Sequence, residues 1–115
     1  MSQSIDLASE QCQACRPGAP QVKGQERAVL LQLIPAWEVV RVNDVERLHR
    51  SFVFSDFSQA LAFTLRVGGL AEVMGHHPLI VTEWGRVSVD WWTHKIGGLH
   101  RNDFVAAAKT DSLYE

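Results

Sequence analysis

The feature that most constrains the fold of this chain is a long run of apolar residues at helical spacing, which lies between a possible N-capping pair and a glycine. Ser55-Asp56 precedes the repeat and suits a helix start, and Gly75 suits a helix end. The pattern predicts the longest helix, of about 18 residues. Gly68-Gly69 either weakens it by about 1 kcal/mol per glycine or admits a closely packed neighbour. The positions at helical spacing are Phe57, Ala60, Leu61, Phe63, Thr64, Leu65, Gly68, Ala71 and Val73.

Two β-rich stretches flank this helix, and each reads as an antiparallel hairpin. The turns are predicted at Asn43-Asp44 and at Gly85-Arg86, residue types that tolerate turn geometry. The strands are predicted over residues 37–42, 45–54, 79–84 and 87–92.

Successive side chains of a β-strand point to opposite faces of the sheet, which assigns the residues of two of these strands to faces. Val87, Val89, Trp91 and Thr93 share one face, so Trp92 and His94 lie on the other. Trp91 and Trp92 therefore cannot both face the same core, and one of them is expected either to pack or to cover a substrate or subunit contact. In the second strand, His49 lies opposite the face of Leu48 and Phe52 and is expected to be solvated or hydrogen-bonded rather than to bind a ligand.

Two shorter helices complete the pattern. One covers residues 24–34 and stops at Pro35; the other covers residues 102–111, with Asn102 as N-cap and Asp103 in the first turn. The order helix, hairpin, helix, hairpin, helix predicts an α+β fold, a four-stranded antiparallel sheet with three helices packed on one face. A chain of 115 residues, 46% of them hydrophobic, suits a single domain, here residues 21–115.

Residues 1–20 are polar and contain the two cysteines, Cys12 and Cys15. A Cys-x-x-Cys pair suits half of a zinc site or a redox dithiol, but no second pair follows and Pro17 and Pro20 favour irregular chain. We expect a flexible arm with reduced thiols. The alternative is a metal shared between subunits or held partly by histidine.

Charge and hydropathy exclude several classes of partner. The net charge of -2 and pI near 6.2 leave no basic surface for nucleic acid or an anionic membrane. No apolar run is long enough to span a bilayer, and the N-terminus lacks the basic-then-apolar order of a secretory signal. We expect a cytoplasmic protein that binds neither nucleic acid nor membrane.

The segment Glu72 to Pro78, Glu-Val-Met-Gly-His-His-Pro, places two imidazoles on a bend at the end of the long helix. Glu72 lies about one turn before His76, so its carboxylate is expected to fix the imidazole tautomer. An ordinary solvated loop is the alternative for so short a motif.

Glu72, His76-His77-Pro78, Trp84, His94 and Asp103, in this order and spacing, resemble the signature of the pterin-4a-carbinolamine dehydratases, also known as dimerisation cofactors of a hepatocyte nuclear factor. Thr-Glu-Trp-Gly and Gly-Leu-His-Arg-Asn-Asp-Phe are similar to bacterial members. Gly75 departs from the animal members, which carry an acidic residue there. The resemblance implies that family's α+β fold.

The resemblance also implies an activity and a site. The reaction would be dehydration of a 4a-hydroxytetrahydropterin to a quinonoid dihydropterin, which recycles the cofactor of an aromatic amino acid hydroxylase such as phenylalanine hydroxylase. It needs an acid at the leaving oxygen and a base at the ring N–H, and it demands no metal or organic cofactor. His76 and His94 would be the acid–base pair, His77 would orient the pterin, Glu72 would support His76 and Asp103 would support His94. The pocket would be lined by His76, His77, Pro78, Thr93, His94, Lys95 and Ile96.

Other readings of the same residues stay open. A three-histidine metal site is one, although adjacent histidines seldom both face one ion. A non-catalytic module that binds a partner protein is a second, and a role in molybdopterin-related pterin metabolism is a third. The resemblance implies a homodimer or homotetramer formed through sheet edges and helix faces.

Overall fold

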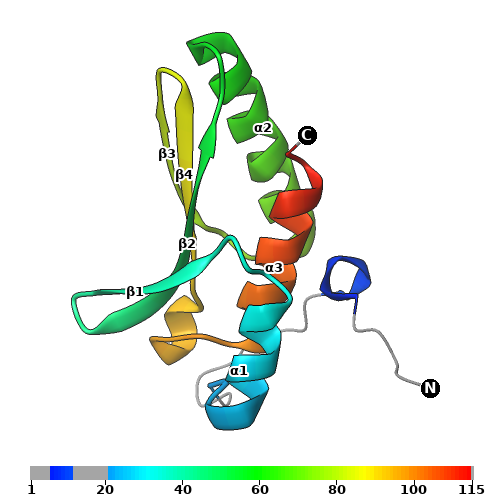
Figure 1. The fold of residues 1–115 in the computed structure, drawn as a ribbon, viewed down its shortest axis with the longest axis vertical. Coiled ribbons are helices and arrows are strands. Elements are labelled where there is room, and N and C mark those ends of the chain that lie inside the picture. The colour runs from blue at the N-terminus through cyan, green and yellow to red at the C-terminus, as the bar shows by residue number, and fades with distance from the viewer. Residues whose placement is uncertain (1–5, 12–20, 115) are drawn as a thin grey trace.

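The computed structural model describes residues 6–11 and 21–114, which form an α+β fold (Figure 1). A four-stranded antiparallel sheet has the strand order β1-β2-β4-β3, and the helices lie on one side of it. The predicted fold class is confirmed. The elements are η1 (Leu7–Ser9), α1 (Gly24–Gln32), β1 (Glu38–Val42), β2 (Val45–Val53), α2 (Phe57–Met74), β3 (Leu79–Glu83), β4 (Arg86–Trp91), η2 (His94–Ile96) and α3 (Arg101–Ser112).

The two hairpins, β1–β2 and β3–β4, are joined into one sheet by the pairing of β2 with β4. The first part of β2 pairs with β1 and the second part pairs with β4, so the hairpins point toward opposite ends of the molecule in Figure 1. Asn43 and Asp44 form the first turn with φ angles of 51° and 64°, in the left-handed region that these residues tolerate. The second turn is Trp84-Gly85, one residue before the predicted one, because Glu83 pairs with Arg86.

The long helix α2 begins and ends where its sequence predicts. The Asp56 side chain accepts a hydrogen bond from the Gln59 N–H at 2.8 Å, which caps the first turn. Gly75 ends the helix with a left-handed φ of 66°. A Cβ added at Gly68 or Gly69 would meet nothing within 4 Å, so the close neighbour considered for this pair is not found in the described part of the chain.

The core lies between the sheet and helices α2 and α3. The sequence predicted the inward face of β4 correctly, since Val87, Val89 and Trp91 are fully buried. Phe52 of β2 packs against Phe63 of α2 with ring centroids 4.7 Å apart. Burial of such side chains stabilises by about 1.5–3 kcal/mol each, so these contacts fix how the helices sit on the sheet.

Helix α3 is capped by a different residue from the one predicted. The N-cap is His100, whose Nδ1 accepts a hydrogen bond from the Asn102 N–H at 3.0 Å. Asn102 therefore lies inside the helix, and its predicted capping role is wrong. Asp103 does lie in the first turn, where its carboxylate also accepts a hydrogen bond from the backbone N–H of His100 at 2.8 Å.

Residues 6–11, which belong to the predicted N-terminal arm, pack against α3. Leu7 is buried, and the Lys109 amine donates to the Ala8 carbonyl at 2.7 Å. Arg101 donates two hydrogen bonds to Glu10, which hold the pKa of that carboxyl below its usual range. The predicted thiols of Cys12 and Cys15 lie outside the described residues. Within the described ranges, no helix combines the length and apolarity needed to cross a membrane.

Candidate active site

The His76-His77 pair lies on the bend between α2 and β3, as its sequence context predicts. The left-handed Gly75 turns the chain, and the His76 N–H still donates to the Ala71 carbonyl at 3.2 Å. Pro78 then directs the chain into β3. This short bend fixes the backbone from which both imidazoles project.

Asp103 joins this bend to the segment that carries the third histidine. Its side chain is fully buried, and Oδ1 lies 2.7 Å from His76 Nε2. Its Oδ2 accepts hydrogen bonds from the Thr93 hydroxyl at 2.7 Å and from the His100 N–H at 2.8 Å. One carboxylate therefore ties together the α2–β3 bend, the chain after β4 and the start of α3.

The Asp103 contacts define the tautomer of His76. Because both carboxylate oxygens act as acceptors, His76 Nε2 is the donor and Nδ1 is the nitrogen that can take a proton. The His76 ring also stacks on Trp91, with centroids 5.4 Å apart and planes 16° apart. Trp91 is held in turn by a hydrogen bond from its Nε1 to the Thr110 hydroxyl at 3.0 Å.

His77 and Glu72 form a separate and more exposed pair. His77 Nε2 lies 2.6 Å from Glu72 Oε2, and the two side chains are 59% and 78% exposed. Glu72 was expected to support His76, and Asp103 to support His94. The structure instead pairs Glu72 with His77 and Asp103 with His76. The reason is the reversal of the chain at Gly75, which turns His77 rather than His76 back toward the last turn of α2.

His94 begins the short helix η2 directly after Thr93. Thr93 and Gly98 form an isolated antiparallel bridge, with the Thr93 N–H donating to the Gly98 carbonyl at 2.9 Å. This bridge closes the loop that also contains Lys95 and Ile96. The His94 ring packs on Trp92 with centroids 4.5 Å apart. Asp103 thus contacts the neighbour of His94 rather than His94 itself.

A second polar cluster, formed by Arg47, His49, Asp90 and Trp92 on the outer face of the sheet, was not predicted from the sequence. His49 Nδ1 lies 2.6 Å from Asp90 Oδ1, so His49 is hydrogen-bonded, one of the two states expected for it. Arg47 donates to the other Asp90 oxygen at 3.3 Å and lies over the Trp92 ring at 3.9 Å. The alternation of side chains along each strand shows which residues share a face of the sheet. It does not show which strands are neighbours, so the contacts of this cluster could not be predicted.

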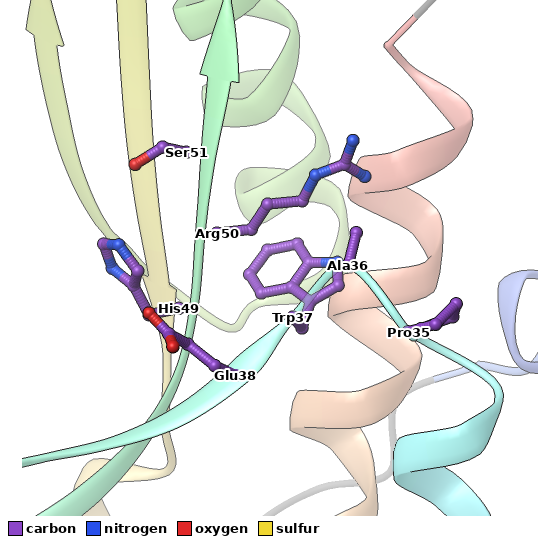
Figure 2. A pocket seen from close by; sticks show the side chains of 7 residues that line it. All are labelled: Pro35, Ala36, Trp37, Glu38, His49, Arg50 and Ser51. Atoms are coloured by element: carbon purple, nitrogen blue, oxygen red, sulfur yellow. The ribbon is translucent and has the colours of Figure 1, made fainter.

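A notch of about 550 Å³ lies elsewhere, at the start of β1 (Figure 2). It contains none of the predicted catalytic residues, so it is not the site that the sequence singled out. Two of its polar side chains are already engaged by α3, because Arg50 and Trp37 both donate to Asp111. The lining residues are Pro35, Ala36, Trp37, Glu38, His49, Arg50 and Ser51.

The histidines do not converge as metal ligands do. His76 and His77 turn to different carboxylates, Asp103 and Glu72. Across residues 6–11 and 21–114, no group of three or more His, Cys, Asp or Glu side chains has the arrangement of a metal site. The geometry instead resembles a carboxylate-supported imidazole, which suits proton transfer.

Comparison with known proteins decides the family. Residues 20–113 match the family model described as pterin 4 alpha carbinolamine dehydratase. The chain belongs to this family. Its members are hydro-lyases that act on a pterin, so the dehydratase activity and the pterin substrate class expected from the resemblance are supported.

Individual relatives agree with this assignment. A protein of Gloeobacter violaceus, provisionally named a pterin-4-alpha-carbinolamine dehydratase, is 55% identical over 109 residues, covering 95% of this chain and 94% of its own. A relative from Nitrosococcus oceani with the same provisional name is 54% identical and covers 94% of this chain and 96% of its own. The crystal structure of a transcriptional coactivator/pterin dehydratase from Brucella melitensis shares 29% identity with a TM-score of 0.74, covering 84% of this chain and all of that one.

Proposed function

We propose that this member of the family dehydrates a 4a-hydroxytetrahydropterin to the quinonoid dihydropterin by histidine acid–base catalysis. The observation that supports this most strongly is the buried Asp103 carboxylate, which binds His76 Nε2 and the hydroxyl of Thr93, the residue before His94. One buried carboxylate is thereby bonded to His76 and to the residue that precedes His94 in the chain. The substrate would lie between residues 76–78 and 93–96.

The reaction breaks the bond between carbon 4a and its hydroxyl oxygen and forms a double bond to the adjacent ring nitrogen. The nitrogen loses its proton to a base, and the hydroxyl leaves as water with a proton from an acid. His76 is the base, because Asp103 keeps the Nε2 proton in place and leaves Nδ1 to accept one. His94 is then the acid at the leaving oxygen.

His77 and Glu72 orient the pterin rather than transfer its protons. The pair is exposed at the edge of the bend, and its hydrogen bond keeps the His77 ring in one orientation. Lys95 and Ile96 follow His94 and line the other side of the substrate. Each proton-transfer group contributes about 10²- to 10⁴-fold to the rate, so the two imidazoles suffice for a substrate that already dehydrates unaided.

The physiological role we propose is recycling of the pterin cofactor of an aromatic amino acid hydroxylase, in the cytoplasm. Phenylalanine hydroxylase is the expected source of the carbinolamine. The experiment adds purified protein to a bacterial phenylalanine hydroxylase reaction and follows the carbinolamine absorbance. We expect the transient to disappear in proportion to added protein; an undiminished transient would contradict the recycling role.

We also propose a homodimer or homotetramer. Helix α2 carries Phe57, Leu61 and Leu65 one turn apart and Val73 two turns further on, past Gly69. Leu65 and Val73 are 69% and 87% exposed in the single chain. A stripe of exposed apolar side chains at helical spacing suits contact with another helix. Light scattering of the purified protein tests this, and a strictly monomeric mass would contradict it.

A further inference from the structure

We propose that Arg47 is a positioning residue for this reaction, because it holds the Trp92 indole and, through the indole, the His94 imidazole. The inference rests on the proposed function, in which His94 transfers a proton. It assigns a task to the cluster on the outer face of the sheet, which the mechanism above does not use.

The strand register places Arg47 beside Trp92. The pairing of β2 with β4 includes Leu48 opposite Trp91, and both of these side chains are fully buried toward the helices. The next residues along the two strands, Arg47 and Trp92, therefore face each other on the opposite side of the sheet. The Arg47 guanidinium carbon lies 3.9 Å from the centre of the indole ring.

Arg47 is itself fixed by a neighbouring cross-strand pair. Its terminal nitrogen donates to Asp90 Oδ2 at 3.3 Å, and the other Asp90 oxygen lies 2.6 Å from His49 Nδ1. The Arg47 and Asp90 side chains are only 16% and 11% exposed. Among the described residues, the buried Nε of Arg47 has no hydrogen-bond partner. The guanidinium is thus anchored at one end and otherwise packed on the indole.

This arrangement matters because His94 is exposed. The Thr93–Gly98 bridge fixes the backbone of the loop but not the torsion angles of the His94 side chain. The ring contact with Trp92, at 4.5 Å between centroids, is what selects its orientation. A guanidinium over an indole attracts the face of the ring and so favours the indole position in which the two groups stack. A proton donor displaced by about 1 Å costs up to about 10²-fold in rate.

The test compares Arg47→Met and Arg47→Lys with wild type, with Arg86→Met as the matched control. Arg86 lies on the same face of β4 as Trp92, but at the other end of the strand. It forms an ion pair with Glu83 at 3.6 Å, and both of these side chains are more than half exposed. Stopped-flow dehydration gives kcat and KM. The ring protons of His94, assigned with His94→Gln, report on Trp92 through its ring current in NMR spectra.

We expect Arg47→Met to lower kcat about tenfold with KM within about twofold. Trp92→Leu, which has no indole, serves as the reference spectrum. In Arg47→Met the His94 ring signals should move toward their positions in that reference. Arg47→Lys should fall between Arg47→Met and wild type, because lysine keeps the charge but not the flat guanidinium. Arg86→Met should match wild type in both measurements.

Wild-type kcat in Arg47→Met, or a lower kcat with unmoved His94 signals, would overturn the inference. If Arg47→Met does not fold, Arg47→Gln tests the same point: it keeps a polar side chain and the indole but removes the cation, so it should shift the His94 signals and lower kcat, and an unchanged kcat would refute the proposal. Failure of the proposed function is distinct, since it appears as wild-type protein that does not accelerate dehydration, and the NMR comparison still decides the positioning role.

Discussion

His76 and Asp103 are 27 residues apart in the chain, and their side chains meet with 2.7 Å between Nε2 and Oδ1. The contact brings together the bend after α2 and the first turn of α3. Because the carboxylate also accepts from the Thr93 hydroxyl and the His100 N–H, its orientation is set by the fold before any substrate binds. Such preorganisation is what a proton-transfer site requires.

Replacing this carboxylate by an amide should reverse the His76 tautomer. In Asp103→Asn the amide oxygen must stay with the two donors, Thr93 and His100, so the amide NH2 faces His76. Nε2 must then accept, and the proton moves to Nδ1, which can no longer act as base. We expect kcat/KM to fall about 10²- to 10⁴-fold, measured by stopped-flow dehydration.

The matched control is Asp56→Asn, at the N-cap of α2. Asparagine caps a helix as well as aspartate does, so this variant should keep wild-type activity and stability. An Asp103→Asn protein that is folded and as active as Asp56→Asn would show that the His76 contact is not part of the catalytic machinery.

The His100 cap should stabilise the start of α3. His100→Ala removes the acceptor for the Asn102 N–H and should lower the free energy of unfolding by about 0.5–2 kcal/mol in urea denaturation. His100→Ser should restore most of this loss, because a serine hydroxyl caps the same N–H. Equal stability of the alanine and serine variants would contradict a capping role for this side chain.

Glu46 should make stability depend on pH. Two hydrogen bonds from Arg27, at 2.9 and 2.8 Å, lower the pKa of Glu46 in the folded protein. With the folded pKa below the unfolded one, the stabilisation is complete above the unfolded pKa of about 4.5 and is lost as the pH falls through the folded pKa. Glu46→Gln should therefore be less stable than wild type at pH 7, by about 0.2–1 kcal/mol, and closer to it near pH 3.

The control for this pH effect is Glu83→Gln, whose carboxylate has a long and exposed contact with Arg86. Its stability should follow wild type at both pH values. If Glu46→Gln and wild type differ by the same amount at pH 7 and pH 3, the interaction with Arg27 is not electrostatic in the way described.

Local signals predicted most of the fold. Asp56 and Gly75 marked the two ends of α2, and the alternation of Val87, Val89 and Trp91 marked the buried face of β4. These features depend on neighbours within a few residues, which the sequence displays directly. The turn at Trp84-Gly85 was displaced by one residue because glycine can occupy either position of a two-residue turn.

The partners within the candidate site could not be predicted in the same way. Glu72 was paired with His76 by helical spacing, but the left-handed Gly75 ends the helix first and His77 receives the carboxylate. Asp103 and His76 meet only through packing of α3 beside the bend. Arg47 and Trp92 are neighbours because the strand order is β1-β2-β4-β3. Two predicted hairpins do not determine which of their strands pair with each other.

The most direct test of the account is stopped-flow dehydration of a freshly generated 4a-hydroxytetrahydropterin by wild type, His76→Ala, His94→Ala and the double variant. We expect each single variant to lose about 10²- to 10⁴-fold in kcat/KM while remaining folded, and the double variant to approach the uncatalysed rate. Wild-type rates in either single variant would contradict the claim that the two imidazoles exchange protons with one pterin.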